Sequence, residues 1–264
     1  MKSLSLTVLK DVTMYKSISK TMIFMLFLSI NLFAKNPVYS PTFDDIMLQT
    51  LPNRAFTFDD ENITIKVPNY ADNPTQVPIF IDASKIKDAK RVIVFADLNP
   101  LPQVLDMQLI HAKPILSFNI RVAQETPLRA LVQDAKGAWH VGSANIKSAG
   151  GGCSVSDAPD KSKAFARLLG QHKSQVTRQD NLYRIKFSIF HPMETGLMFG
   201  KASFYIEDIE LYTKELLLAK LSISSSISQN PRMLLQTSAG EGDYMLILND
   251  TDANTYEIPA HYGE

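Results

Sequence analysis

The residue of this sequence best suited to covalent chemistry is Cys153, the only cysteine in 264 residues. It directly follows Gly150, Gly151 and Gly152 in the stretch SAGGGCSVSD. A thiolate can form and break bonds to sulfur reversibly. Glycines remove side-chain bulk and open backbone conformations that are closed to other residues. The pattern therefore predicts a thiol on a slender, flexible arm, although free cysteines are also often small apolar residues in a core.

The sequence around Cys153 offers little to activate the thiol. No lysine, arginine or histidine is adjacent, and Lys147 and Lys161 are the closest cations in the chain. A neighbouring positive charge is a usual means of lowering the pKa of a thiol. Cys153 is therefore predicted to be a passive attachment point, activated by a partner enzyme, rather than a catalytic nucleophile.

Other catalytic patterns are missing from the sequence. No phosphate-binding loop, nucleophile elbow or dinucleotide fingerprint occurs. Acidic pairs such as Asp59–Asp60 fit a solvated surface. The five histidines are His111, His140, His172, His191 and His261. No two of them have the spacing typical of metal ligands. We therefore predict no bound metal, no cofactor and no enzymatic activity of the chain on its own.

A second motif is the string HPMETG. Its histidine and glutamate could exchange protons, but nothing in the sequence pairs them with a nucleophile. Alternatively, the proline ends a strand and the glycine closes a turn, so that the string packs at an interface between domains. The motif comprises His191, Pro192, Met193, Glu194, Thr195 and Gly196.

The N-terminus has the features of an export signal. Lys16 and Lys20 precede an apolar run over residues 21–34, which has the length of a signal-peptide core and is short for a membrane span. We expect residues 1–34 to be a signal peptide, with the start possible at Met14 and an uncleaved anchor as the alternative. The mature protein is then expected in the periplasm. An odd cysteine in an exported protein suggests intermolecular pairing or a working thiol.

The elements around these motifs are predicted to be mostly β. The first predicted domain spans residues 43–148. It begins with one or two helical turns over 43–51 and continues in short alternating runs separated by turn residues, a pattern typical of a β-sandwich. Residues 149–163 have no apolar periodicity and are predicted to form a Gly/Ser-rich linker. A helix then leads into a second β-sandwich over 164–264. In its clearest strand, residues 182–190, Tyr183, Ile185 and Phe187 share one face. The run 214–221 could be helical, but its position favours a strand.

The charge of the chain is balanced. The sequence has 27 basic and 27 acidic residues, which excludes the strongly basic composition typical of nucleic-acid-binding proteins. No basic cluster in the sequence suggests an anionic membrane surface. We therefore expect no nucleic acid partner and no membrane contact beyond the export signal.

Taken together, these motifs resemble the SoxY and SoxZ families, the two subunits of the carrier complex of thiosulfate oxidation. SoxY ends in a Gly-Gly-Cys arm, which GGGC at residues 150–153 resembles, and NPLP at 99–102 and RV at 121–122 are similar to other SoxY positions. SoxZ carries nearly the same string as HPMETG after a strand, and YIEDIEL and QNP also resemble SoxZ segments. The fusion of both halves resembles carriers associated with quinoprotein (PQQ-dependent) dehydrogenases.

The resemblance implies a fold of two immunoglobulin-like β-sandwiches and a carrier function. Cys153 would hold a sulfur-containing intermediate covalently and present it to redox or hydrolytic enzymes of sulfur oxidation. In this chain a second domain follows the arm, so Cys153 would sit on a loop tethered at both ends. The alternative is an accessory or binding module for a quinoprotein dehydrogenase, in which Cys153 is incidental.

Overall fold

A computed structural model describes residues 36–52, 54–154 and 163–263. The predicted signal peptide at 1–34, the possible start at Met14 and residues 155–162 of the predicted linker lie outside the described residues. Among the described residues, no helix is long and apolar enough to cross a membrane.

The described chain consists mostly of β-strands, as predicted. The first half contains α2 (Phe43–Thr50), β1 (Phe56–Phe58), β2 (Thr64–Lys66), β3 (Val77–Asp82), β4 (Arg91–Ala96), β5 (Gln103–Leu109), β6 (Ala112–Ile120), β7 (Thr126–Gln133) and β8 (Trp139–Ile146). A short 3₁₀ turn, η1 (Gly152–Ser154), follows. The second half contains α3 (Lys163–Leu168), β9 (His172–Gln179), β10 (Leu182–Ile189), β11 (Ile206–Thr213), β12 (Leu216–Ile223), β13 (Arg232–Thr237), β14 (Asp243–Asp250) and β15 (Thr255–His261).

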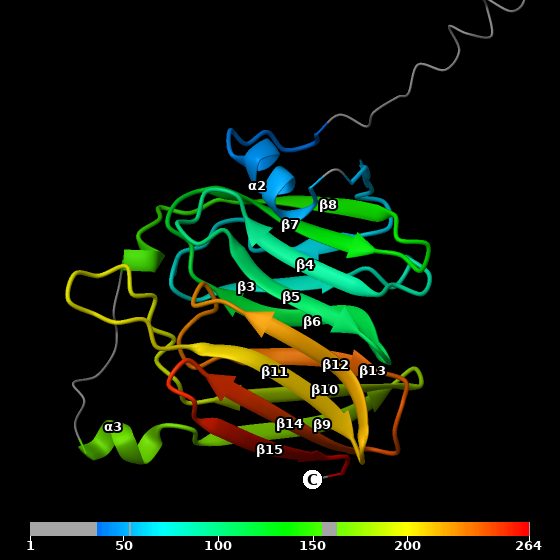
Figure 1. Ribbon diagram of the computed structural model, residues 1–264, viewed down its shortest axis with the longest axis vertical. Helices are drawn as coiled ribbons and strands as arrows, with labels where there is room; N and C mark the ends of the chain where they lie inside the picture. Colours follow the sequence, from blue (N-terminus) through cyan, green and yellow to red (C-terminus); the bar gives the residue numbers. More distant parts are fainter. Residues whose placement is uncertain (1–35, 53, 155–162, 264) are drawn as a thin grey trace, which may run out of the picture. The chain divides into compact units, whose positions relative to one another are not determined.

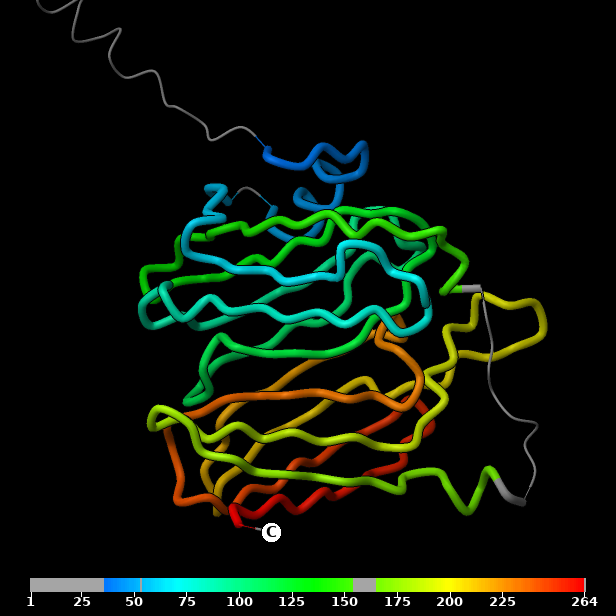
Figure 2. Tube along the Cα trace, turned by 180° about the vertical axis from the view of Figure 1, so that it is seen from behind, coloured from blue at the N-terminus to red at the C-terminus, as the bar shows by residue number. Residues whose placement is uncertain are grey.

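The two halves share both of their sheets. One sheet has the order β1-β8-β7-β4-β5-β12-β11-β14-β15 and the other has the order β2-β3-β6-β13-β10-β9. Strand β5 of the first half pairs with β12, and β6 pairs with β13. Figure 1 shows the nine-stranded sheet in front, and Figure 2 shows the six-stranded sheet from the opposite side. The two predicted sandwiches thus lie edge to edge, and main-chain hydrogen bonds join them.

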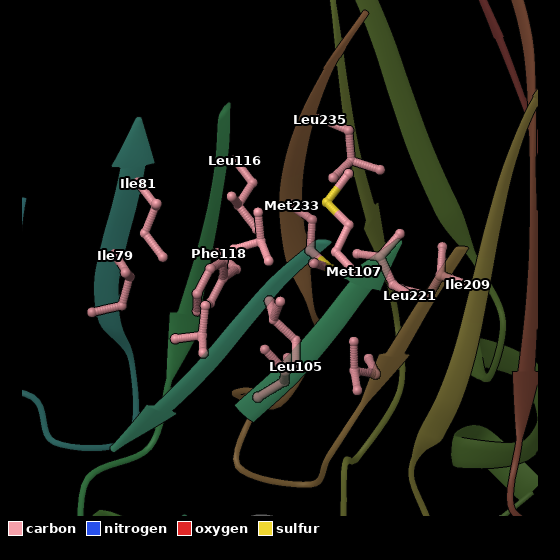
Figure 3. Close-up of a cluster of buried hydrophobic side chains, with 14 of the residues drawn as sticks. Ile79, Ile81, Leu105, Met107, Leu116, Phe118, Ile209, Leu221, Met233 and Leu235 are labelled. Carbon is pink, nitrogen blue, oxygen red and sulfur yellow. The ribbon is translucent and has the colours of Figure 1, made fainter. Parts of the chain in front are cut away.

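The hydrophobic core is also continuous between the halves. Figure 3 shows apolar side chains of both halves pointing toward one another between the two sheets, among them Phe118 on β6, Met107 on β5, Leu221 on β12 and Met233 on β13. All four are at most 3 % exposed. Apolar burial contributes about 25 cal/mol per Å², so this shared core makes separation of the halves costly.

A second, smaller core lies on the outer surface of the nine-stranded sheet. Helix α2, predicted from the sequence, places Phe43, Met47 and Leu51 against buried side chains of β4, β7 and β8. Arg129 is fully buried, pairs with Asp97 at 3.1 Å and stacks on the ring of Phe43 at 4.7 Å. This ion pair links β7 to the turn after β4 and to the segment that leads into the helix.

The strand predictions hold where the apolar pattern is strong. Along β10, Tyr183, Ile185 and Phe187 are buried on one face. The run 214–221 is not helical: it begins with a two-residue turn and continues into strand β12 from Leu216. Strand β9 was not predicted. Val176 is its only buried residue, because β9 lies at an edge of its sheet, so its sequence has no apolar alternation.

Candidate functional site

The segment that carries Cys153 leaves β8 and lies along the end of β6. The amide of Gly151 donates to the carbonyl of Ala123 and the amide of Gly152 donates to the carbonyl of Val122, both at 2.9 Å. The amide of Gly150 donates to Ser148 Oγ at 3.0 Å. The glycine run thus acts as a short edge segment held by main-chain hydrogen bonds.

Close packing explains why glycine is required here. A Cβ on Gly152 would lie 2.0 Å from the carbonyl oxygen of Pro74, and one on Gly150 would lie 2.4 Å from that of Ala123. Gly150 also has φ +83°, a conformation that side chains with a Cβ disfavour. These contacts are with backbone atoms, which cannot move aside as a flexible side chain can. Gly150 and Gly152 therefore let the segment pack closely, which sequence reasoning did not anticipate.

Cys153 itself is buried, in contrast to the exposed thiol that the sequence suggested. It is 4 % exposed and forms no disulfide. Removal from water raises the pKa of the thiol to about 11, and the positive charge of Arg121 only partly opposes this effect. Burial disfavours a thiolate because the charge loses its hydration. In this conformation Cys153 is therefore a protected, neutral thiol.

Arg121 connects this segment with the second half of the chain. It lies just after β6 and is 3 % exposed. Its guanidinium donates to the carbonyls of Met193 and of Pro192, the latter at 3.1 Å, and to that of Ser225 at 3.3 Å. Its own carbonyl accepts a hydrogen bond from Asn99 Nδ2 at 2.8 Å. Arg121, at a position where the sequence resembles SoxY, thus meets the SoxZ-like motif, while Asn99 binds the main chain of Arg121.

The HPMETG motif forms a buried turn at this junction. Met193 is fully buried with φ +50°, and its amide donates to His191 Nδ1 at 3.2 Å. Glu194 is 9 % exposed, and its main chain bonds with that of Phe204 at 2.7 and 3.1 Å. Gly196 has φ +72°. The motif thus packs against Arg121 of the first half.

His191 is poorly placed for acid–base chemistry. It is fully buried, its ring lies 4.5 Å from that of Phe204, and its Nε2 lies 3.5 Å from Asp250 Oδ2. Burial lowers the pKa of His191 to about 4, and the carboxylate of Asp250 only partly opposes it. Because Nδ1 accepts a hydrogen bond, the neutral ring carries its proton on Nε2. We conclude that His191 is a neutral structural residue.

The lowered pKa of His191 predicts a pH-dependent stability. Below the ordinary pKa of 6.5, the unfolded chain binds a proton that the folded chain excludes, so the free energy of unfolding falls as the pH decreases toward 4. This group alone accounts for a loss of about 2 kcal/mol by pH 4.5. Urea denaturation at pH 7.5 and 4.5 measures the loss. The variant His191→Asn keeps an acceptor near the Met193 amide, and it should lose much less stability between pH 7.5 and pH 4.5 than the wild type does. An equal loss in the variant would contradict the assignment.

After the motif, the chain forms a loop with exposed apolar side chains. Leu197, Met198 and Phe199 are 46 %, 39 % and 106 % exposed. Figures 1 and 2 both show this yellow loop beside the green end of the first half that carries η1.

Within the described residues, no group of three or more His, Cys, Asp or Glu side chains could hold a metal ion.

The structure thus brings together residues that lie far apart in the sequence. Cys153 and the HPMETG motif are joined through Arg121. The sequence identified the two motifs separately and singled out Arg121 only through the SoxY resemblance. Its role as a link could not be deduced from the sequence, because its three carbonyl partners are 71 to 104 residues away.

Comparison with known proteins finds two family matches, one over the half that carries Cys153 and one over the half that carries the HPMETG motif. Residues 48–153 match the family of the sulfur oxidation protein SoxY, and residues 172–260 match the family of the sulphur oxidation protein SoxZ. The SoxY match ends at Cys153. A search of curated proteins gave no match.

Solved structures give more distant similarities. The sulfur carrier protein SoxY from Chlorobium limicola f thiosulfatophilum is 24 % identical, with 40 % of this chain and 96 % of that chain covered and a TM-score of 0.36. A glycosyl hydrolase family 2 member from Bacteroides cellulosilyticus is 14 % identical. The match covers 75 % of this chain and 28 % of the hydrolase, with a TM-score of 0.22. The assignment therefore depends on the two family matches, which together place a SoxY domain and a SoxZ domain in tandem, and the chain belongs to these sulfur oxidation families as a SoxY–SoxZ fusion.

Proposed function

We propose that this protein is a periplasmic carrier that holds a sulfur-containing intermediate on Cys153 and presents it to partner enzymes of sulfur oxidation. The observation that carries the proposal is the position of Cys153, the only cysteine, at the last residue of the SoxY match. The proposed carrier does no chemistry alone. Its domains correspond to 43–148 and 164–264, joined by a linker at 149–163, after removal of a signal peptide at 1–34.

The attachment step needs a partner that accepts electrons. When the thiol joins a thiosulfate-type anion through a new S–S bond, the thiol loses its proton and the two sulfur compounds together lose two electrons. A periplasmic redox enzyme would accept these electrons. A hydrolytic enzyme could later cleave a terminal sulfonate from the carrier with water, which leaves the remaining sulfur on Cys153.

As a carrier, the protein would need to move its thiol out of the described buried position. In the described position Cys153 is sheltered from water, which would protect a reactive adduct. To reach an enzyme, the segment must break the hydrogen bonds of Gly151 and Gly152 to Ala123 and Val122, each of which contributes about 1 kcal/mol. Such an opening is small enough for a partner to induce by binding.

Mass spectrometry of protein from the native source tests the proposal. Cells grown on reduced sulfur should yield a chain with a reductant-sensitive added mass on Cys153, and its N-terminus should follow Ala34. The Cys153→Ser variant should carry no adduct and should support no sulfur oxidation. An unmodified Cys153 under growth on reduced sulfur and on alcohols would remove the main support for the carrier.

A second candidate function is favoured by the burial of the thiol. An accessory module for a quinoprotein dehydrogenase would need no reactive cysteine, and a 4 % exposed thiol with a raised pKa fits an incidental residue. The same variant distinguishes the two. Cys153→Ser should leave an accessory module fully active, whereas a carrier should lose all activity.

A further inference from the structure

The outward face of the six-stranded sheet is strongly basic. Strand register places alternate residues of each strand on this face, and we define its cations as the basic face. These are Lys66 on β2, Lys113 on β6, Arg232 on β13, Arg184 and Lys186 on β10, and Lys173 on β9. The outward strand residues of this face include one acid, Asp82 on β3. Figure 2 shows this sheet toward the viewer.

The cations of the basic face have no acidic partner within the described residues. No ion pair involves any of the six, and Arg184 donates instead to the amide oxygen of Gln179 at 2.9 Å. Lys66 lies over the ring of Phe80 at 5.5 Å. The register places Lys186 diagonally across from Lys173 and Arg232, and like charges at this cross-strand spacing repel one another unless a counter-charge is bound. The arrangement therefore favours an anionic partner outside this chain.

The opposite sheet shows a different pattern. On the outward face of the nine-stranded sheet, Arg91 pairs with Asp106 and Lys220 pairs with Glu210 at 2.9 Å. His261 Nδ1 lies 3.1 Å from Asp243. The net charge of the chain is zero, so the unpaired cations of one face are balanced by acids elsewhere. The charge of the basic face is thus a local feature of one surface.

The basic face also has a hollow of about 550 Å³. Lys173, Lys186 and Arg232 line it together with the polar side chains of Ser188 and Asn119, and no acidic side chain lines it. Register places Lys173 and Arg232 on either side of Ser188. The hollow is shallow and open, and it presents three cations and several hydrogen-bonding groups in one area.

The hollow lies at the end of the sheet that adjoins Cys153. Asn119 precedes Arg121 by two residues, and Arg232 follows Asn230, whose amide donates to the carbonyl of His191 at 2.8 Å. Arg121 contacts the HPMETG motif and is the charge that acts on Cys153. A molecule bound over the hollow would therefore lie at the same end of the sheet as the thiol segment.

We propose that the basic face binds the acidic surface of a protein partner and so brings that partner to the segment that carries Cys153. The width favours a protein over a small anion, because the cations extend from β2 to β9, about 24 Å at the usual strand spacing. The composition favours a protein over a membrane. The residues between the cations are largely polar, whereas proteins that lie on membranes insert apolar side chains. The docking role extends the proposed carrier function, but binding itself does not require Cys153.

The experiment uses the mature chain and fluorescently labelled poly-L-glutamate as an acidic polypeptide probe. Fluorescence anisotropy should show binding that weakens with salt, with equal affinity for wild type and Cys153→Ser. The triple variant Lys173→Glu, Lys186→Glu, Arg232→Glu should bind at least about tenfold more weakly. The control changes the same charge at Lys136→Glu, Lys214→Glu, Lys220→Glu, three exposed lysines on or beside the nine-stranded sheet, and should bind within about twofold of wild type.

Three outcomes would overturn the proposal. Equal weakening in both triple variants would show that net charge alone attracts the probe. Displacement of the probe by sulfate beyond the effect of chloride at equal ionic strength would assign the hollow to a small anion. Binding to phosphatidylglycerol vesicles without binding to poly-L-glutamate would assign the face to a membrane. Because Cys153→Ser separates binding from sulfur attachment, failure of the carrier function alone would leave the probe affinity unchanged.

Discussion

At pH 8, the thiol of Cys153 is expected to react with a small maleimide at least about a hundredfold more slowly in the folded protein than in the same chain unfolded in urea. Two physical reasons combine. Burial raises the pKa of Cys153 to about 11, which reduces the thiolate fraction, and the side chain is only 4 % exposed to reagent. The rate in the folded protein should keep increasing with pH beyond the range in which an ordinary cysteine is fully ionised.

A single cysteine makes this measurement direct, because all label incorporated by mass reports on Cys153. Gly152→Ala is the informative variant. Its methyl group would lie 2.0 Å from the Pro74 carbonyl and should displace the segment, so that labelling accelerates toward the unfolded rate. Gly137→Ala is the control: at φ +85° it also strains the backbone locally, but its Cβ would lie 3.9 Å from the nearest atom and far along the chain from Cys153, so it should label at the wild-type rate. Equal rates in folded and unfolded wild-type chain would contradict the buried position.

Arg121→Met is expected to lower the free energy of unfolding by about 4 kcal/mol, because three buried carbonyls lose a charged donor and each unsatisfied group costs about 1–3 kcal/mol. The carbonyls belong to Pro192, Met193 and Ser225 in the second half. Arg91→Met is the matched control. Arg91 is 39 % exposed and pairs with Asp106 at the surface, so its loss should cost less than about 1 kcal/mol.

Denaturant unfolding followed by two signals makes the Arg121 test specific. Trp139, the only tryptophan, is buried in the first half, whereas circular dichroism reports the strands of both halves. In wild type and Arg91→Met the two transitions should coincide, because the sheets and the core are continuous between the halves. If Arg121→Met cost no more than Arg91→Met, the guanidinium would not be a structural link between the halves.

Much of the fold could be predicted because its strands carry their own burial pattern. The alternation in β10 and the apolar residues of α2 predict elements that the structure contains. Strand β9 could not be predicted in the same way. It lies at a sheet edge with Val176 as its single buried residue, and its hydrogen bonds to β10 come from pairing rather than from its own side chains. Edge strands of this kind are specified by their neighbours.

The candidate site also contains some features that the sequence predicts and others that it does not. Cys153 and the HPMETG string are recognisable because their residue types are distinctive along the chain. The burial of Cys153 could not be predicted, because three consecutive glycines indicate flexibility locally, whereas here the lack of side chains at Gly150 and Gly152 permits close packing against Ala123 and Pro74. That packing depends on segments remote in the sequence.

The sequence by itself determined the β-rich class, the order of the two domains and the two motifs by which the chain resembles SoxY and SoxZ. These follow from local residue types and from alternation along single strands. Only the tertiary structure decided that the halves share their sheets, that the thiol is buried beside Arg121, and that cations from five strands gather on one face. Burial, electrostatic fields and charge clustering depend on distances in space, which a balanced count of 27 basic and 27 acidic residues conceals.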